Sequence, residues 1–339
     1  MTPHVQHDSN RRGVLVIHPG ALGDVLLARP VLHALQRQFS QHEIALLAGN
    51  AVGTLLRDAG EIDRVFPLES TYLSELFAGH DSVCAPFKRW LSRCDKAVGW
   101  FRDADAAVVR TLRAAGVQSI NLRSSSSQEC FAEHQSDRYL ESVETADAGR
   151  ACNLPLILSP AVMAEAQQIL RSLNWDSRSP LVVIHPGSGS PHKCVEAWRL
   201  AEVIQWFIEG GMTPMLLEGP ADREPCARVL SALRTPVPVS RGLNLSKSAA
   251  VLAQAALYLG HDSGVTHLAA ALAVPTVACF GPTNPRRWAP LGPTVSVVSG
   301  EPCACSTWSD VASCQERVCL QIAPERMIAA CRAQLDKQP

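Results

Sequence analysis

Short aliphatic runs alternate along the chain with longer segments in which apolar residues recur every three or four positions. The run at 13–18 (GVLVIH) precedes residues 24–39, and the run at 43–48 (EIALLA) follows them. The apolar positions of 24–39 that fall largely on one helical face are Val25, Leu26, Val31, Leu32, Leu35 and Phe39. The second half repeats the alternation, from LVVIHP at 181–186 to VSVVS at 295–299. This pattern predicts an α/β fold with two parallel sheets, each covered by helices on both faces.

A polar, turn-forming stretch, NWDSRSP at 174–180, separates the two halves and places a domain boundary between residues 152 and 180. A chain of 339 residues suits two domains better than one hydrophobic core. We therefore predict an N-terminal domain at 1–160 and a C-terminal domain at 175–322. The remaining residues, 323–339, are predicted to form an amphipathic helix that begins at a proline and must pack on another element.

The charge balance narrows the expected partners. The chain has 31 Lys and Arg against 32 Asp and Glu, for a formal net charge of -1, so it has no broad basic field and we expect no nucleic-acid partner. The first twelve residues are polar and lack the apolar segment of a secretory signal, which favours a cytoplasmic protein. The apolar stretch at 267–280 is shorter than the roughly 20 residues that a membrane span needs, and Pro275 interrupts it.

The twelve cysteines are scattered through a large chain, which favours reduced thiols over a disulfide framework. Four of them gather near the end, at Cys303, Cys305, Cys314 and Cys319. Their spacing is not the paired C-x-x-C arrangement of zinc knuckles, so packed or loop cysteines are favoured over a structural metal. The sequence D-A-D at 103–105 resembles a metal-binding D-x-D motif. It lies at the start of a predicted helix, where acidic residues are expected as caps, and we predict no metal site.

The tetrapeptide Ile-His-Pro-Gly occurs twice, at 17–20 and 184–187, each time after a predicted strand and before a helix. Open parallel sheets bind ligands at such junctions. After the second copy, small residues and Lys193 suit a phosphate, although an ordinary glycine-rich turn is the alternative. After the first copy, Asp24 begins the helix, and its charge opposes phosphate binding. We therefore predict an anion site after the second copy and a general base after the first.

The segment HDSGVTHLAAAL at 261–272 predicts a second anion-binding loop. It opens an alanine-rich helix, whose first N–H groups come from Ser263, Gly264, Val265 and Thr266. With Lys193 and His267 as further donors, the two loops of one domain would clasp a diphosphate from two sides. The alternative makes Asp262 or Ser263 a plain helix cap and His267 a core residue.

Three segments resemble glycosyltransferase family 9, the ADP-heptose:lipopolysaccharide heptosyltransferases. They are GALGDVLLARPVLHAL, HPGSGSPHKCVEAW and HDSGVTHLAAALAVPTVACFGPTNPRRWAP, and their order along the chain is that of the family. The resemblance covers nearly the whole second half and the first forty residues. Residues 60–150 match only loosely, through features such as HQSDRYL, and this weaker region is where the acceptor would bind.

The resemblance implies a GT-B fold, in which two Rossmann-like domains with parallel sheets face each other across a cleft. The donor nucleotide-sugar would bind the C-terminal domain and the acceptor the N-terminal domain, and the helix at 323–339 would pack back on the N-terminal domain. The reaction would be inverting and would need neither a metal nor a cofactor. The protein would be cytoplasmic, with transient contact at the inner membrane surface because its acceptor is a lipid-linked saccharide.

The family's site residues map onto this chain one by one. Asp24 would be the general base. The phosphate-binding residues would be Ser188, Gly189, Lys193, Asp262, Ser263, Gly264, Val265 and His267. Leu243 and Asn244 would line the adenine pocket, and Glu224 would contact the ribose. The segment GPADRE at 219–224 departs from the family's spacing by one residue, which affects the assignment of Glu224.

The expected function is transfer of heptose from ADP-heptose to a lipopolysaccharide inner-core acceptor. The alternatives are a transferase of the same fold that uses another nucleotide-sugar, a nucleotide-sugar epimerase, and a non-catalytic nucleotide-sugar-binding protein. A nicotinamide dehydrogenase is disfavoured, because neither glycine-rich loop has the G-x-G-x-x-G spacing with an acidic residue about 20 positions later.

Overall fold

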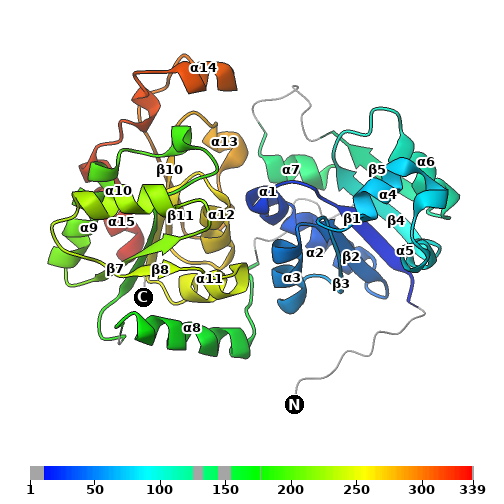
Figure 1. The fold of residues 1–339 in the computed structure, drawn as a ribbon, viewed down its shortest axis with the longest axis horizontal. Helices are drawn as coiled ribbons and strands as arrows, with labels where there is room; N and C mark the ends of the chain where they lie inside the picture. Colours follow the sequence, from blue (N-terminus) through cyan, green and yellow to red (C-terminus); the bar gives the residue numbers. More distant parts are fainter. Residues whose placement is uncertain (1–10, 125–132, 144–153, 176, 338–339) are drawn as a thin grey trace. The chain divides into compact units, whose positions relative to one another are not determined.

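The computed structural model describes residues 11–124, 133–143, 154–175 and 177–337. The chain forms two compact units (Figure 1). Unit 1 comprises Met1–Ala21, Ala28–Cys130 and Ser136–Cys152, and unit 2 comprises Leu22–Leu27, Phe131–Gln135 and Asn153–Pro339. The main segment of unit 2 thus begins at Asn153 and includes the helix at 160–172.

The core of unit 1 is a five-stranded parallel sheet in the order β3-β2-β1-β4-β5. Its strands are β1 (Gly13–Ile17), β2 (Glu43–Ala48), β3 (Arg64–Pro67), β4 (Cys94–Trp100) and β5 (Ser119–Arg123). Its helices are α2 (Arg29–Gln38), α3 (Asn50–Asp58), α4 (Tyr72–Ala78), α5 (Ala85–Leu91), α6 (Ala107–Ala114) and, from its second residue on, α7 (Gln135–Leu140). Every residue of β1 and β2 is buried, as expected for strands covered on both faces.

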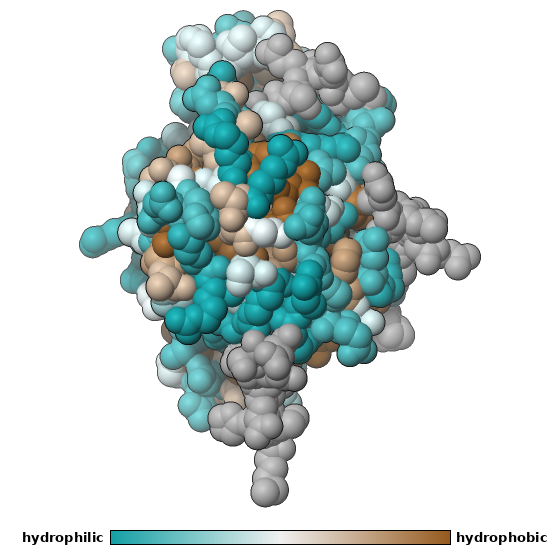
Figure 2. Space-filling view, turned by 90° about the vertical axis from the view of Figure 1, so that its right-hand side faces the viewer, coloured by the Kyte–Doolittle hydropathy of each residue, from teal (hydrophilic) through white to brown (hydrophobic). Residues whose placement is uncertain are grey.

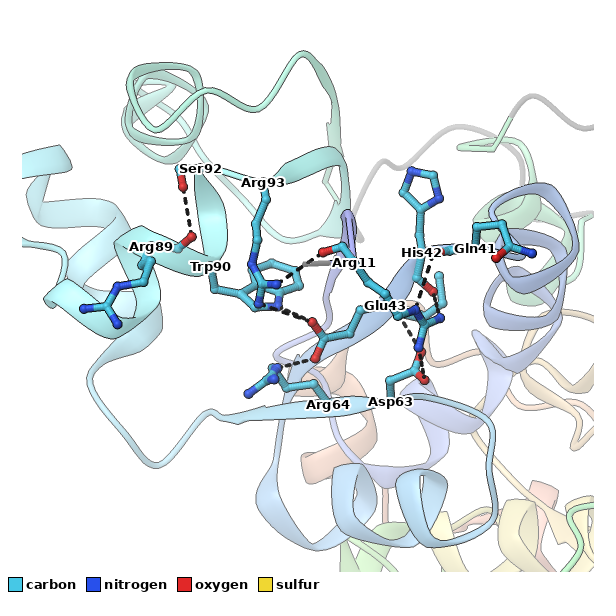
Figure 3. Close-up of polar contacts among 11 residues, drawn as sticks. Arg11, Gln41, His42, Glu43, Asp63, Arg64, Arg89, Trp90, Ser92 and Arg93 are labelled. Carbon is cyan, nitrogen blue, oxygen red and sulfur yellow. Dashed lines mark hydrogen bonds and ion pairs between the residues drawn. The ribbon is translucent and has the colours of Figure 1, made fainter. Parts of the chain in front are cut away.

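A polar cluster lies at the amino ends of these strands (Figure 3). The carboxylate of Glu43, which is 4% exposed, accepts hydrogen bonds from Trp90 Nε1 at 2.8 Å and Arg64 Nε at 2.5 Å. Arg93 lies 3.7 Å from the same carboxylate. Ligands of parallel sheets bind at the opposite, carboxyl edge. The cluster is therefore a structural one that compensates the buried charge of Glu43, and removal of a partner would leave that charge unpaired.

The predicted helix at 24–39 is two helices, α1 (Leu22–Leu27) and α2. Pro30 stands in the first turn of α2 and has no N–H group, so the α1 hydrogen-bond ladder cannot continue through it. The carbonyl of Ala28 instead accepts from Val31 N at 2.9 Å. The break matters for the site, because α1 belongs to unit 2 whereas α2 belongs to unit 1.

Unit 2 is built on a six-stranded parallel sheet in the order β11-β10-β9-β6-β7-β8. Its strands are β6 (Leu181–His185), β7 (Thr213–Glu218), β8 (Val239–Arg241), β9 (Leu257–His261), β10 (Thr276–Phe280) and β11 (Val295–Ser299). Its helices are α1, α8 (Pro160–Ser172), α9 (Ala197–Glu209), α10 (Arg223–Ala232), α11 (Leu245–Leu252), α12 (Gly264–Ala271), α13 (Pro285–Trp288), α14 (Trp308–Ser313) and α15 (Pro324–Leu335). The two parallel sheets confirm the predicted α/β fold class.

The last helix, α15, packs within unit 2. Met327 and Cys331 on its inner face are fully buried in the core cluster of that unit, and Met327 Sδ lies 3.5 Å from Cys279 Sγ of β10. The helix contacts α9, β10 and β11. Its apolar face is thus covered within unit 2, and a further contact of this helix with the N-terminal domain stays a prediction.

Large exposed apolar side chains are scattered over the described residues rather than gathered. They are Phe77, Leu154, Ile157, Trp198, Val297 and Trp308. Figure 2 shows one face of the molecule, on which the hydrophobic areas are small and interrupted by hydrophilic residues. Within the described part of the chain, every helix is too short or too polar to cross a lipid bilayer.

Candidate functional site

The strand order of unit 2 reverses between β6 and β9, and the loops after these two strands meet at the carboxyl edge of the sheet. The loop after β6 carries the second Ile-His-Pro-Gly copy and continues through Ser188 and the exposed Gly189 to Lys193. The loop after β9 begins at Asp262. A hydrogen bond from Ser188 Oγ to the carbonyl of Asp262, at 2.6 Å, joins the two loops. The structure thus brings together the two segments that the sequence predicted as one anion site.

Lys193 and Asp262 form the charged centre of this edge. The Lys193 Nζ lies 2.7 Å from Asp262 Oδ2, and Thr283 Oγ1 donates to the same oxygen at 2.6 Å. The side chain of Asp262 is 8% exposed and that of Lys193 is 20% exposed. The Lys193 ammonium also lies 5.5 Å from the ring centre of Trp308. Asp262 therefore positions the lysine, and the amino end of α12 is capped by a different residue.

That cap is Ser263, whose Oγ accepts from Thr266 N at 3.4 Å. The first N–H groups of a helix have no acceptor within it, and here they belong to Gly264 and Val265. The positive end of the helix dipole lies at the same place. Gly264 has no room for a side chain, since a Cβ would lie 2.9 Å from Leu22 Cβ of α1. The geometry suits an anion at the amino end of α12.

Helix α1 packs against α12 inside unit 2 and brings Asp24 to this site. A Cβ on Gly23 would lie 2.9 Å from the ring of His267, so the two helices touch there. Asp24 follows directly, in the first turn of α1, and is partly buried. His267 is 6% exposed, and burial lowers its pKa to about 4, although the nearby Asp262 acts in the opposite direction. His267 is therefore neutral at neutral pH and packs on α1.

The sequence reasoning missed a buried, hydrogen-bonded histidine and aspartate beside the site. His185, the histidine of the second Ile-His-Pro-Gly copy, is 2% exposed, and its Nε2 lies 2.9 Å from Asp222 Oδ2. Its Nδ1 lies 3.4 Å from Ser263 Oγ. Burial acts to raise the pKa of Asp222, but the hydrogen bonds from His185 and from the backbone of Gly219 outweigh it, and the pKa is lowered. The sequence signals that could have suggested this pair were a histidine at the end of a strand and an aspartate just before a helix.

The carboxylate of Asp222 occupies the space beside two nearby glycines. Side chains at Gly187 or Gly219 would overlap it. Glu224, two residues later, is exposed and pairs with Arg228 at 2.5 Å. In GPADRE the buried carboxylate is thus Asp222, while Glu224 lies on the surface of α10.

A surface cleft of about 730 Å³ opens beside the loop after β6. The residues that line it include Pro186, Val195, Glu224, Arg228 and Arg317. Leu243 and Asn244 are not among its lining residues. Asn244 caps α11, with its Oδ1 accepting from Lys247 N at 2.9 Å, and Leu243 is partly buried next to it.

The first Ile-His-Pro-Gly copy has a different environment in unit 1. His18 is 2% exposed, and its ring centre lies 5.4 Å from that of Trp100 and 5.3 Å from that of Tyr139. Its Nδ1 accepts from Gly20 N at 3.2 Å, and its Nε2 has no hydrogen-bond partner among the described residues. Burial lowers the pKa of His18 to about 4.

The two other features singled out in the sequence have local roles. Asp103 caps α6, since its carboxylate accepts from Val108 N at 3.3 Å and Val109 N at 3.1 Å, as predicted. The four clustered cysteines line one small cavity together with His192. None of these four, Cys303, Cys305, Cys314 and Cys319, forms a disulfide bond within the described residues. In the part of the chain that the structure describes, no group of three or more His, Cys, Asp or Glu side chains is arranged to hold a metal ion.

Comparison with known sequences finds similarity to heptosyltransferases. The sequence profile of glycosyltransferase family 9 (heptosyltransferase) matches residues 105–315. Lipopolysaccharide heptosyltransferase 2 of Escherichia coli (strain K12) is 22% identical over 323 residues, which covers 84% of this chain and 87% of that protein. Lipopolysaccharide heptosyltransferase 1 of Pseudomonas aeruginosa is 39% identical over 109 residues, a match that spans 32% of this chain and 30% of the length of that relative.

Two solved structures share the fold over nearly their whole length. The family 9 glycosyl transferase from Veillonella parvula DSM 2008 has a TM-score of 0.78 at 19% identity, covering 96% of this chain and 98% of its own. The ADP-heptose lps heptosyltransferase II of E. coli has a TM-score of 0.74 at 21% identity, with 96% and 99% covered. Both similarities confirm a GT-B fold class with two Rossmann-like units.

Proposed function

Because the chain belongs to glycosyltransferase family 9 (heptosyltransferase), we propose that it transfers heptose from ADP-heptose to a lipopolysaccharide inner-core acceptor. The observation that supports this most is the joint placement of Lys193 and the amino end of α12 at the switch point of the unit 2 sheet. These are two sources of positive potential for one diphosphate. The names of the relatives supply the donor and the acceptor class.

The leaving group is the part of the reaction that unit 2 would stabilise. As the bond from the sugar to the diphosphate breaks, negative charge grows on the phosphate oxygens. Lys193 and the N–H groups of Gly264 and Val265 are held in place before the reaction and would stabilise that charge. We therefore propose a metal-independent reaction. Glu224, in the cleft next to Pro186, would contact the ribose, and Leu243 with Asn244, outside the lining of that cleft, would contact the adenine.

Asp24 would act as the general base. The acceptor hydroxyl must lose its proton as it attacks the anomeric carbon, and a carboxylate within hydrogen-bond reach can accept that proton. Asp24 lies one residue after Gly23, where α1 contacts α12, and thus near the proposed diphosphate position. One base and one displacement predict inversion at the anomeric carbon.

The acceptor is proposed to be a lipid-linked saccharide bound mainly by unit 1. Because the acceptor lipid lies in a membrane, the protein would visit the inner membrane surface as a peripheral, cytoplasmic enzyme.

Incubation with ADP-heptose and a set of truncated lipopolysaccharide cores, read by mass spectrometry, tests this proposal. Addition of one heptose to one core, undiminished in EDTA, is the expected result, and NMR of the product reports the anomeric configuration. The Asp24→Asn variant is the control for enzyme-dependent transfer. Transfer only from another nucleotide-sugar, or donor isomerisation without acceptor, would replace the assignment with one of the alternatives.

A further inference from the structure

Three loops of unit 2 meet at the imidazole of His185. His185 ends β6, Asp222 immediately precedes α10 in the loop after β7, and Ser263 caps α12 after β9. Asp222 Oδ2 lies 2.9 Å from the Nε2 of His185 and also accepts from Gly219 N at 3.0 Å. An ionised carboxylate only accepts hydrogen bonds, so the Nε2 of His185 carries the proton. In the neutral ring, Nδ1 is then an acceptor directed at the hydroxyl of Ser263, 3.4 Å away.

The pair of caps formed by Ser159 and Ser263 shows what is special about this arrangement. Both serines accept from the N–H of the third helical residue at 3.4 Å, Ser159 at the start of α8 and Ser263 at the start of α12. Ser263 has in addition the contact with His185, and its Oγ lies 3.1 Å from Thr266 Oγ1. One hydrogen bond accepted from the first turn caps a helix, as at Ser159, so capping alone does not explain the buried His185 and Asp222 behind Ser263.

We propose that His185 is a positioning residue for the bound nucleoside diphosphate. It fixes the hydroxyl of Ser263 through Nδ1, and Asp222 fixes the tautomer and the orientation of the ring through Nε2. The inference rests on the proposed function, because it assigns the diphosphate to the amino end of α12. His185 itself does not touch the diphosphate.

The physical gain is preorganisation. A hydroxyl that can rotate among several acceptors leaves the first turn of a helix less well fixed, and a ligand must supply the free energy to order it. The charge environment of the ring supports a fixed contact. Asp222 is the nearest charge, the neighbouring His261 has its pKa lowered to about 4 by burial, and Asp262 is already paired with Lys193 at 2.7 Å. The contacts from Asp222 through His185 to Ser263 therefore order the amino end of α12 without adding charge to it.

A double-mutant cycle tests the inference. His185→Gln keeps an N–H donor near Asp222 but removes the acceptor for Ser263, and Ser263→Ala removes the hydroxyl. Binding of ADP to the full chain is measured by calorimetry for both variants and for the double variant. We expect a roughly five- to tenfold higher Kd for each single variant, as for a lost hydrogen bond. If His185 acts through Ser263, the double variant binds ADP no more weakly than Ser263→Ala alone.

Kinetics supply a second readout. The KM for the donor should rise in His185→Gln while kcat stays within about twofold. The reason is that the contact of His185 with Ser263 orders the amino end of α12 equally in the substrate complex and in the transition state. Ser159→Ala is the matched control, because it removes an equivalent cap and should lower thermal stability with unchanged ADP affinity. Thermal unfolding of His185→Gln shows that any lost affinity is measured on folded protein.

Two results would overturn the inference, and they differ in meaning. Multiplicative single effects in the double variant, with ADP binding to the parent chain intact, reject the role of His185 and leave the proposed function in place. Failure of the parent chain to bind ADP rejects both.

Discussion

The same four residues, Ile-His-Pro-Gly, end the first strand of each sheet, yet their histidines have opposite surroundings. His18 packs against the rings of Trp100 and Tyr139, and burial lowers its pKa to about 4. His185 is equally buried but lies between a carboxylate and a hydroxyl. Local sequence therefore specifies the strand-to-loop junction, and the neighbouring strands decide what the histidine does there.

The residues that follow the two junctions differ in charge. After His18 the chain enters α1, which carries the proposed base Asp24 and no lysine or arginine. After His185 it reaches Lys193, held by Asp262 at the amino end of α12. We propose proton transfer at the first junction and diphosphate binding at the second. The following experiments test that division.

The largest effect is expected from Asp24→Asn. The variant keeps the shape of the side chain but removes the base, so kcat should fall about 10²- to 10⁴-fold. The Kd for ADP should stay within about twofold, because the phosphate contacts are unchanged. Single-turnover assays and calorimetry measure the two quantities. Turnover at the parent rate would remove Asp24 from the mechanism.

Lys193→Ala should act on the other side of the comparison. Loss of a charge-assisted contact with the diphosphate is expected to raise the Kd for ADP by roughly 10- to 100-fold. The measurement is titration with ADP at two salt concentrations, since an exposed charge contributes less at high salt. Lys247→Ala, on α11, is the matched control and should leave the Kd unchanged. An unchanged Kd in Lys193→Ala would instead assign the lysine to holding Asp262.

The stability of the folded chain should depend on pH through His18. The pKa of His18 is lowered to about 4 from 6.5, so the folded state resists a proton that the unfolded chain accepts. Its contribution to stability is present above pH 6.5 and is lost as the pH falls toward 4. Between pH 7 and pH 5 this amounts to about 2 kcal/mol.

Urea unfolding at the two pH values, in the parent chain and in His18→Leu, isolates this contribution. The buried histidines of unit 2 contribute equally to both proteins and cancel in the difference. We expect the parent chain to lose about 2 kcal/mol more than the variant on acidification. Equal losses would show that another group protects His18 from protonation.

The smallest effect is expected from Glu224→Gln. Glu224 is an exposed member of a surface pair with Arg228, and such pairs contribute little to stability. Loss of one contact with the ribose should change the Kd for ADP by no more than a few-fold, whereas Asp222→Asn disturbs a buried pair and should lower the melting temperature. A large effect of Glu224→Gln on ADP affinity, together with a small one of Asp222→Asn on stability, would reverse this ranking.

Most of the fold could be predicted from the sequence, because parallel strands buried on both faces are continuous apolar runs. The segments 13–18, 43–48 and 181–186 each gave a strand. The break before Pro30 was missed because the hydrophobic period continues across it. The packing of α15 within unit 2 could not be predicted, because an amphipathic helix shows that it has a buried face but does not show which sheet covers it.

The site could be predicted only as far as its loops. Glycine-rich turns and a helix start are local, and they placed Lys193 and Ser263 on adjoining loops. The pairing of His185 with Asp222 joins residues 37 positions apart, and no periodicity marks it. The family resemblance suggested Glu224, although the spacing of its segment departs from the family's by one residue. The structure shows two carboxylates there with opposite exposure, Asp222 and Glu224.

Helix α1 has a consequence for how this chain can be divided. It belongs to unit 2 although the residues on either side of it belong to unit 1. A fragment that starts at Asn153 would lack Leu22, which covers Gly264, and would leave the amino end of α12 without its apolar neighbour. Recombination or truncation at the apparent boundary would thus separate unit 2 from part of its own structure. An exchangeable module would need residues 22–27 as well, which a single cut in the gene cannot supply.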